Sequence, residues 1–231
     1  MPSVSAATAT IGRGALKVRA LPGVWRPHSD ARMLAQLVAE SGFATGVDVL
    51  DVFTGSGALA LAAAASGARR VTAVDLSRRA LLTVRLNALR NQLRVRTLRG
   101  DMFAPVAAES FDLIVANPPY YPGGEALPER GLARAWEGGP DGRLLVDRLC
   151  REAPAQLRAG GRLLMVHNTM IGERQSLEAL EAAGLRTQVL LRHRGPYGPV
   201  GEAAAALLRE RGVDVPDAEE TVVISGQRGV P

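Results

Sequence analysis

Residues 117–120, Asn-Pro-Pro-Tyr, directly follow the apolar run FDLIVA at residues 111–116. Proline has no backbone N–H and cannot continue a β-ladder, so a strand there must end at Asn117. A planar NH2 group has a delocalised lone pair and is a poor nucleophile. The side-chain oxygen of Asn117 and the carbonyl of Pro118 could accept its hydrogens while the ring of Tyr120 stacks on it. The tetrapeptide therefore indicates transfer to a planar amino group, with the rate coming from alignment and electrostatics.

A second stretch, DVFTGSGALALA at residues 51–62, joins a predicted strand to a predicted helix. Gly55 and Gly57 let the backbone turn sharply and approach a ligand, and the helix N-terminus offers free N–H groups. The loop matches the dinucleotide pattern G-x-G-x-x-A, and Asp75 lies 20 residues beyond Gly55, where an acid binds ribose hydroxyls. On these residues alone, the cofactor could be NAD.

Two further carboxylates favour a different cofactor. Asp51 ends the first strand and can contact a ligand amine, while Asp101 follows the third strand and can accept from the amine of an adenine. Carboxylates at three successive strand ends suit S-adenosylmethionine (SAM), which is cationic, and would repel a pyrophosphate. We therefore predict SAM as the cofactor, bound by Asp51, Thr54, Gly55, Gly57, Asp75, Asp101 and Asn117.

Strand-like runs alternate with helical segments from residue 47 onward. The predicted strands span residues 47–53, 70–75, 94–100, 111–116, 162–167, 187–192 and 221–225. Several are almost continuously apolar, as expected for parallel strands covered on both faces. The alternation predicts an α/β fold with a doubly wound, seven-stranded, mostly parallel, Rossmann-like sheet. Such a sheet brings the tetrapeptide and the glycine loop together at the carboxyl ends of the strands.

The pattern predicts one domain over residues 14–231, preceded by a loose arm at residues 1–13. A helical lead-in is expected over residues 14–45, with a helix at residues 31–40 packed at the edge of the sheet. Ser77 is the expected N-cap of one later helix. A helix carrying Leu145, Leu149 and Leu157 is expected to end at the glycine pair of residues 160–161.

The composition favours a cytoplasmic protein that is not embedded in a membrane. No window approaches the roughly 20 apolar residues of a membrane helix, and the first dozen residues do not resemble a signal peptide. Cys150 is the single cysteine, so neither a disulfide framework nor a thiolate metal site is expected, and we predict no metal. The net charge of +5 leaves a nucleic-acid partner open, although the arginines are scattered and a solvated surface explains most of them. Arg192–Arg194 with Tyr197 could be a nucleic-acid patch or a solvated strand end.

At these residues the chain resembles the class I SAM-dependent methyltransferases, in the branch with an (N/D)PP(Y/F) motif. That branch includes adenine N6-methyltransferases of DNA and RNA and the HemK-type protein-glutamine N5-methyltransferases. The match covers about residues 24–170, and three stretches of it favour the glutamine enzymes. They are FDLIVANPPYYP, GVWRPHSDARML with Pro27 and Asp30 at the family's positions, and WEGGPDGRLLVDRLC with Trp136, Gly138, Gly139, Asp141 and Gly142 in place.

The resemblance implies methyl transfer to a glutamine side-chain amide of a protein such as a translation release factor. Pro119, Tyr121, His28 and Trp136 are the expected substrate-binding residues. An amino group of adenine or guanine in RNA or DNA, or a small-molecule amine, remains an alternative acceptor. A SAM-binding module without catalysis and an NAD-dependent oxidoreductase are more remote alternatives.

Three departures from the family pattern bear on substrate and partner. No helical substrate domain is expected before the glycine loop, so the chain is more like the short eukaryotic and archaeal branch. The eukaryotic enzymes act with a small zinc-binding partner protein, and nothing in this sequence indicates one. Phe53 stands where the family has a small residue, so the methionine end of the SAM pocket is expected to differ. His28-Ser29 replaces an acidic or small pair, which affects substrate identity more than cofactor use.

Overall fold

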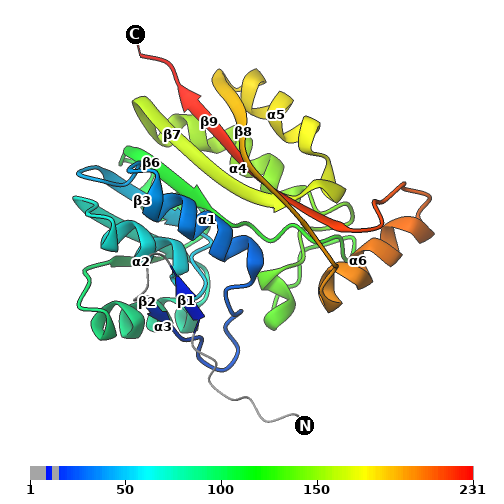
Figure 1. Cartoon of the computed structure of the whole chain (residues 1–231), viewed down its shortest axis with the longest axis horizontal. Coiled ribbons are helices and arrows are strands. Elements are labelled where there is room, and N and C mark those ends of the chain that lie inside the picture. Colours follow the sequence, from blue (N-terminus) through cyan, green and yellow to red (C-terminus); the bar gives the residue numbers. More distant parts are fainter. Residues whose placement is uncertain (1–8, 12–15, 231) are drawn as a thin grey trace.

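A computed structural model describes residues 9–11 and 16–230 and contains one large β-sheet. Its strands are β3 (Asp48–Val52), β4 (Arg70–Asp75), β5 (Arg96–Arg99), β6 (Phe111–Ala116), β7 (Leu157–Asn168), β8 (Leu185–Gly195) and β9 (Glu219–Arg228). The seven strands lie in the order β5-β4-β3-β6-β7-β9-β8, and only β9 runs antiparallel to its neighbours (Figure 1). The predicted fold class is therefore confirmed, including the pairing of β3 with β6 that brings the glycine loop beside residues 117–120.

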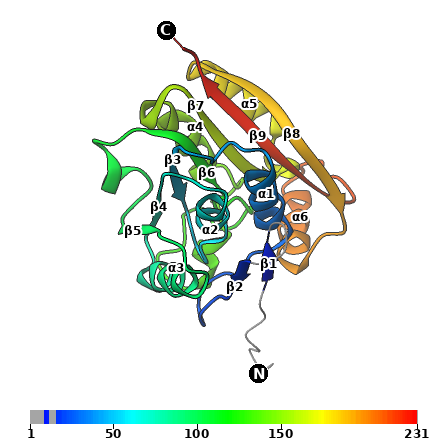
Figure 2. The ribbon, with the colours of Figure 1, turned by 60° about the vertical axis from the view of Figure 1, so that its left-hand side comes forward.

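Helices cover both faces of this sheet (Figure 2). They are α1 (Ser29–Glu40), α2 (Ala58–Ala65), α3 (Arg78–Arg90), α4 (Leu144–Gln156), α5 (Glu173–Ala182) and α6 (Pro199–Glu210), with short 3-10 turns η1 (Ala104–Val106), η2 (Leu132–Ala135) and η3 (Thr169–Ile171). The first three helices share one buried cluster with Val49 of β3, and the last three share another with Leu50. Alternate residues of β3 thus enter opposite cores, which is why the strand is buried throughout.

The N-terminal region differs from the predicted helical lead-in. Residues 9–11 form strand β1 (Ala9–Ile11), which pairs antiparallel with β2 (Leu16–Val18), and the rest of the predicted arm lies outside the described residues. The predicted helix at residues 31–40 begins two residues earlier, as α1. It does not lie at the edge: Leu34 and Val38 are buried with Leu164 of the inner strand β7. The apolar face of α1 needs the centre of the sheet for full burial.

The second half of the sheet is longer than predicted. Strands β8 and β9 extend together towards α6 (Figure 1). Helix α4 ends at Gln156 rather than at the glycine pair, because the backbone of Leu157 is already extended and begins β7. The expected N-cap is confirmed, since Ser77 Oγ accepts a hydrogen bond from the Ala80 N–H at 3.2 Å. Within residues 9–11 and 16–230, none of the helices has the length and apolarity needed to span a membrane.

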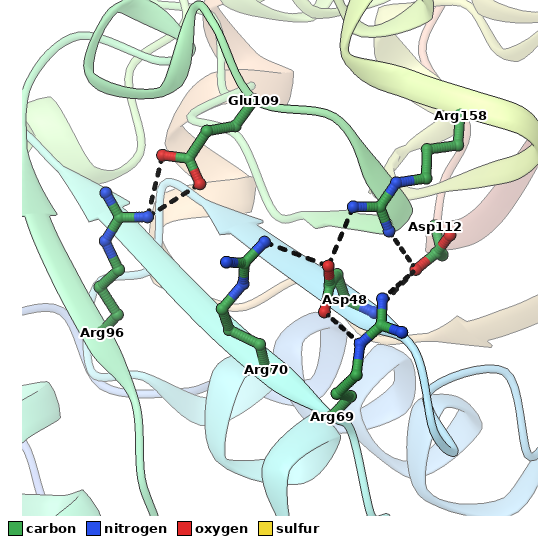
Figure 3. A network of polar contacts seen from close by, with 7 residues as sticks. All are labelled: Asp48, Arg69, Arg70, Arg96, Glu109, Asp112 and Arg158. Atoms are coloured by element: carbon green, nitrogen blue, oxygen red, sulfur yellow. Dashed lines mark hydrogen bonds and ion pairs between the residues drawn. The ribbon is translucent and has the colours of Figure 1, made fainter.

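The amino ends of the central strands carry a network of ion pairs (Figure 3). Asp48 is almost buried and accepts hydrogen bonds from the guanidinium groups of Arg69 at 2.9 Å, Arg70 at 3.1 Å and Arg158 at 2.9 Å. Arg158 also donates to Asp112 at 2.6 Å. The hydrogen bond from Arg69 is the largest cause that holds the pKa of Asp48 well below its usual range, with further lowering by Arg158 and Arg70. The network therefore stabilises the fold at the edge opposite residues 117–120.

We expect Asp48→Asn to lower the free energy of unfolding by about 1–3 kcal/mol at pH 7, because it leaves three guanidinium groups facing a neutral amide. Since the pKa of Asp48 is lower in the folded protein than in the unfolded chain, its contribution is present above about pH 5 and is lost as the pH falls below about 4. Urea titrations at pH 7 and at about pH 2.5 should show the difference shrinking at the lower pH.

Glu109→Gln is the matched control for Asp48→Asn. Glu109 pairs with Arg96 at 2.8 Å in the same view, but the side chain of Glu109 is 26% exposed, whereas that of Asp48 is 6% exposed (Figure 3). Exposed pairs contribute about 0–1 kcal/mol, so the control should change stability little. Equal losses in the two variants would show that burial of Asp48 adds nothing.

Candidate active site

The carboxyl ends of β3, β4, β5 and β6 open onto a cavity of about 680 Å3. This is a usual size for a small-ligand site, for which roughly 300–1,000 Å3 is typical. Most of the predicted site residues line it, namely Thr54, Gly55, Asp75, Asp101, Asn117, Pro118, Pro119, Tyr120, Tyr121 and Trp136. Residues that are far apart in the sequence thus meet at the edge where an open α/β sheet binds ligands.

Asp51 is not part of this lining, which corrects the prediction that it contacts the ligand. Its side chain is fully buried, and one carboxylate oxygen accepts from the Thr54 hydroxyl at 2.5 Å and the Ala60 N–H at 3.0 Å. Burial raises the pKa of Asp51 to about 7, and the nearby carboxylate of Asp75 raises it further. Asp51 therefore holds the turn between β3 and α2 in place from beneath.

Gly57 also lies behind the lining. Its φ is +86°, and a Cβ there would lie 3.0 Å from a methyl carbon of Val84, so the position needs glycine for both backbone and packing reasons. Phe53, in the same turn, does line the cavity and has a φ of +61°. A bulky residue in this conformation is strained, and its ring packs against the core as compensation. The small residue that the family resemblance implies at this position would suit this backbone better than phenylalanine does.

Asp75 is held between the glycine loop and the start of α3. Its two carboxylate oxygens accept from the Gly55 N–H at 2.9 Å and the Ser77 N–H at 2.8 Å. Burial raises the pKa of Asp75, while these two hydrogen bonds act in the opposite direction. The carboxylate lines the cavity with lone pairs left over, so it can accept from ligand hydroxyls.

Asp101 follows β5 and faces the same cavity, but it has a protein partner. Its Oδ2 accepts from the guanidinium of Arg148 in α4 at 2.5 Å. Arg148 also lines the cavity and pairs with Glu152 at 2.8 Å, which holds the guanidinium from its other side. The carboxylate of Asp101 is therefore oriented, and its other oxygen is the one it can offer to a ligand.

The loop of residues 117–120 is fixed by a residue that the sequence analysis had matched to the family but given no role. Asp30, in the first turn of α1, accepts from Asn117 Nδ2 at 3.0 Å and from the Tyr120 hydroxyl at 3.1 Å. The Asn117 nitrogen is thus engaged, and its side-chain oxygen is what it can offer to a ligand in the cavity. Tyr120 is buried except for a small part of its surface.

Aromatic residues form one wall of the cavity beside this loop. The backbone of Tyr121 pairs with that of Trp136, whose ring stacks on Trp25 with centroids 4.7 Å apart. The Trp25 ring also stacks on His28 at 4.7 Å. His28 itself is exposed and does not line the cavity, so the prediction that it contacts substrate is not supported by its position. Trp25 was missed because an isolated tryptophan before a helix carries no spacing signal.

Tyr121 has a second anchor behind the loop. Its hydroxyl donates to Glu219 Oε1 at 2.6 Å, and the Asn168 side chain donates to the same oxygen at 3.1 Å. Both partners lie at the ends of inner strands, Glu219 at the start of β9 and Asn168 at the end of β7. The two tyrosines are therefore held by two separate carboxylates, and neither side chain can move to another χ1 rotamer without breaking a hydrogen bond.

The donors and acceptors of the lining fit SAM. Asp75 and Asp101 supply acceptors at two neighbouring strand ends for a ribose and an adenine. Asp30 and Glu137 also line the cavity, as do Arg26, Arg79, Arg134 and Arg148. The fit to SAM therefore rests on where Asp75 and Asp101 lie and not on the net charge of the lining. The turn formed by Thr54 and Gly55 provides backbone at the start of α2, so the methionine part would lie there.

Comparison with known proteins agrees with this arrangement. The family model described as methyltransferase small domain matches residues 15–135. A Methanocaldococcus jannaschii protein, provisionally named as a protein N5-glutamine methyltransferase, is 29% identical over 183 residues, which are 79% of this chain and 91% of that protein. The release factor glutamine methyltransferase of Mycolicibacterium smegmatis is 34% identical over 193 residues, which are 80% of this chain and 68% of that enzyme.

Solved structures show the same fold. A chain of the E. cuniculi Mtq2–Trm112 complex, responsible for methylation of the eRF1 translation termination factor, has a TM-score of 0.62 and 21% identity. The comparison covers 90% of this chain and 99% of that one. Further bacterial release factor glutamine methyltransferases are covered over only 45% to 64% of their length. The chain belongs to the methyltransferase small domain family, in the HemK-type branch of the class I methyltransferases.

Proposed function

We propose that this SAM-dependent methyltransferase transfers a methyl group to the side-chain amide nitrogen of a glutamine in a protein. The proposal depends mainly on the orientation of the Asn117 side chain. Its amide nitrogen donates a hydrogen bond to Asp30, so its oxygen can accept one from a ligand. Asn117 lines the same cavity as Asp75, so acceptor and cofactor would meet there. The name of the M. smegmatis relative supports a glutamine amide among the planar amino groups.

The chain's own residues would align the acceptor rather than deprotonate it. When bound, SAM supplies a methyl group on a positively charged sulfur, which keeps the electron pair of the broken carbon–sulfur bond. The Asn117 side-chain oxygen and the Pro118 carbonyl would accept the two hydrogens of the acceptor NH2. The ring of Tyr120 would face its plane. The acceptor nitrogen would give up one proton after transfer, and this proton would leave to solvent.

The finer proposals concern acceptor protein, location and partner. We propose a translation release factor as the acceptor, because relatives of 29–43% identity carry names of glutamine methyltransferases. Most of these names give a release factor as the substrate, and one gives ribosomal protein uL3. A cytoplasmic location follows from such an acceptor. The likeness to a chain of the E. cuniculi complex supports a small partner subunit as a further proposal.

The arginine-rich surfaces do not favour a nucleic-acid base as the acceptor. Arg192 pairs with Glu173 at 2.8 Å and Glu220 at 2.6 Å, as expected of a solvated strand end. A groove of about 690 Å3 is lined by Arg69, Arg70, Arg85, Arg94 and Arg96. It lies at the amino ends of β4 and β5, so RNA held there would not bring a base to Asn117 by that contact.

The acceptor class can be tested by incubating the protein with SAM labelled in the methyl group and separated cell fractions. Protein, RNA, DNA and small molecules would be assayed separately, with Asn117→Ala as the control for transfer at this site. We expect label in the protein fraction, at least about tenfold above the control. Label that depends on Asn117 but enters RNA, DNA or small molecules would overturn the proposed acceptor while keeping the site.

A further inference from the structure

A single carboxylate oxygen connects α1 to the loop that would hold the acceptor. Asp30 Oδ2 accepts both from Asn117 Nδ2 at 3.0 Å and from the Tyr120 hydroxyl at 3.1 Å. The two partners lie 87 and 90 residues away in the sequence, so no local turn explains the contacts. The other oxygen, Oδ1, is buried and makes no hydrogen bond within the described part of the chain.

We propose that Asp30 is a positioning residue that fixes which side of the Asn117 amide faces the acceptor. The inference rests on the proposed function, in which the acceptor presents a planar NH2 group. A carboxylate can only accept hydrogen bonds, so it selects the rotamer that turns the amide nitrogen towards Asp30. The opposite rotamer would place the amide oxygen against the carboxylate and offer an NH2 group to an acceptor that is itself an NH2 group. Both contacts would then be repulsive.

The Tyr120 hydroxyl depends on the same oxygen. Burial and then the charge of Asp30 raise the pKa of Tyr120 well above its usual value, so the hydroxyl stays protonated and donates. Asp30 thus holds the asparagine and the aromatic ring of the loop in one fixed relation. A group that sets the direction of a catalytic amide acts through preorganisation, and its loss should slow transfer without weakening cofactor binding.

The backbone that carries Asp30 is firmly placed. Helix α1 buries Leu34, Ala35 and Val38 completely, which fixes its first turn relative to the sheet. On the other side of Asp30 in the sequence, Trp25 stacks on Trp136 at 4.7 Å, beside the same loop. An acidic side chain in the first turn also stabilises the helix by interacting with its dipole. That effect alone would not require contacts to Asn117 and Tyr120.

Single-turnover transfer to the acceptor found in the fraction assay tests this role. We expect Asp30→Ala to slow transfer by about 10- to 100-fold, the range for loss of a hydrogen bond to a charged group. SAM affinity, measured by isothermal titration, should stay within about twofold. Asp30→Asn keeps a neutral acceptor in place and should recover most of the rate. Glu40→Ala removes an exposed acid from the far end of α1 and should leave the rate unchanged.

A double-variant cycle separates positioning from a general structural effect. If Asp30 acts through Asn117, the variant carrying both Asp30→Ala and Asn117→Ala should be about as slow as Asn117→Ala alone. The inference would be overturned if the double variant were slower by the product of the two single-variant losses, or if Asp30→Ala left the rate unchanged. If Asp30→Ala does not fold, the near-isosteric Asp30→Leu, which also lacks a hydrogen-bond acceptor, takes its place in the same cycle. An unaffected rate in Asn117→Ala would instead overturn the proposed function.

Discussion

Asn117→Ala should slow methyl transfer by roughly 10²- to 10³-fold and leave SAM affinity within about twofold. The variant removes the amide oxygen proposed to hold the acceptor NH2. Asn117 is also among the residues predicted to bind SAM, but its nitrogen donates to Asp30 and its oxygen is assigned to the acceptor, so the contacts proposed for Asp75 and Asp101 stay in place. Single-turnover transfer and isothermal titration of SAM measure the two quantities separately.

Variants at Tyr120 complete this test. Tyr120→Phe keeps the ring and loses only the hydroxyl that donates to Asp30, so a smaller loss of rate is expected than for Asn117→Ala. Tyr120→Ala also removes a side chain of the buried core and should lower the free energy of unfolding by about 3–5 kcal/mol. Its transfer rate must therefore be interpreted together with a measurement of its stability. Should Asn117→Ala keep most of its transfer rate, residues 117–120 are a structural turn and the chemistry lies elsewhere.

Asp75→Ala should weaken SAM binding by roughly 30- to 150-fold, the equivalent of about 2–3 kcal/mol. The carboxylate is proposed to accept from the ribose hydroxyls. It also holds Gly55 N–H at 2.9 Å, so its loss loosens the glycine loop as well. NAD should show no comparable binding to the wild-type protein. Isothermal titration with both cofactors measures these effects.

Ser77→Ala is the matched control for Asp75→Ala. It removes the N-cap of α3, a side chain that also lies beside the cavity, and keeps the carboxylate. Loss of an N-cap costs about 1 kcal/mol of stability and should leave SAM affinity much less changed than Asp75→Ala does. Equal SAM affinities in wild type and Asp75→Ala would contradict the assignment of the ribose site.

The sheet could be predicted from the sequence because its strands are marked by their own residues. Strand β6 is apolar except for Asp112, β3 and β4 each contain three buried apolar residues, and the strand ends are marked by glycine, a carboxylate or proline. Parallel pairing then brings the glycine loop, Asp75 and Asn117 to one edge without further information. The N-terminal pair of β1 and β2 could not be foreseen, since each strand has three residues and no alternation of its own.

The directions of side chains and the contacts between residues far apart in the sequence could not be predicted from the sequence. Asp51 and Gly57 stand in the expected loop, yet one is buried beneath it and the other packs on Val84. The contact of Asp30 with Asn117 joins a helix start to a loop 87 residues later, and no spacing rule predicts such a pair. Sequence patterns report which element a residue belongs to, whereas its partner depends on how the elements pack.

Tandem mass spectrometry of the methylated product tests the central claim most directly. The protein would be incubated with SAM carrying a deuterated methyl group and with release factor, and the modified peptide would be fragmented to locate the methyl. A single methyl on the side-chain nitrogen of one glutamine, absent with Asn117→Ala, is the expected result. A methyl on a lysine, an arginine or a backbone nitrogen, or label found only on a nucleic-acid base, would contradict the proposed amide acceptor.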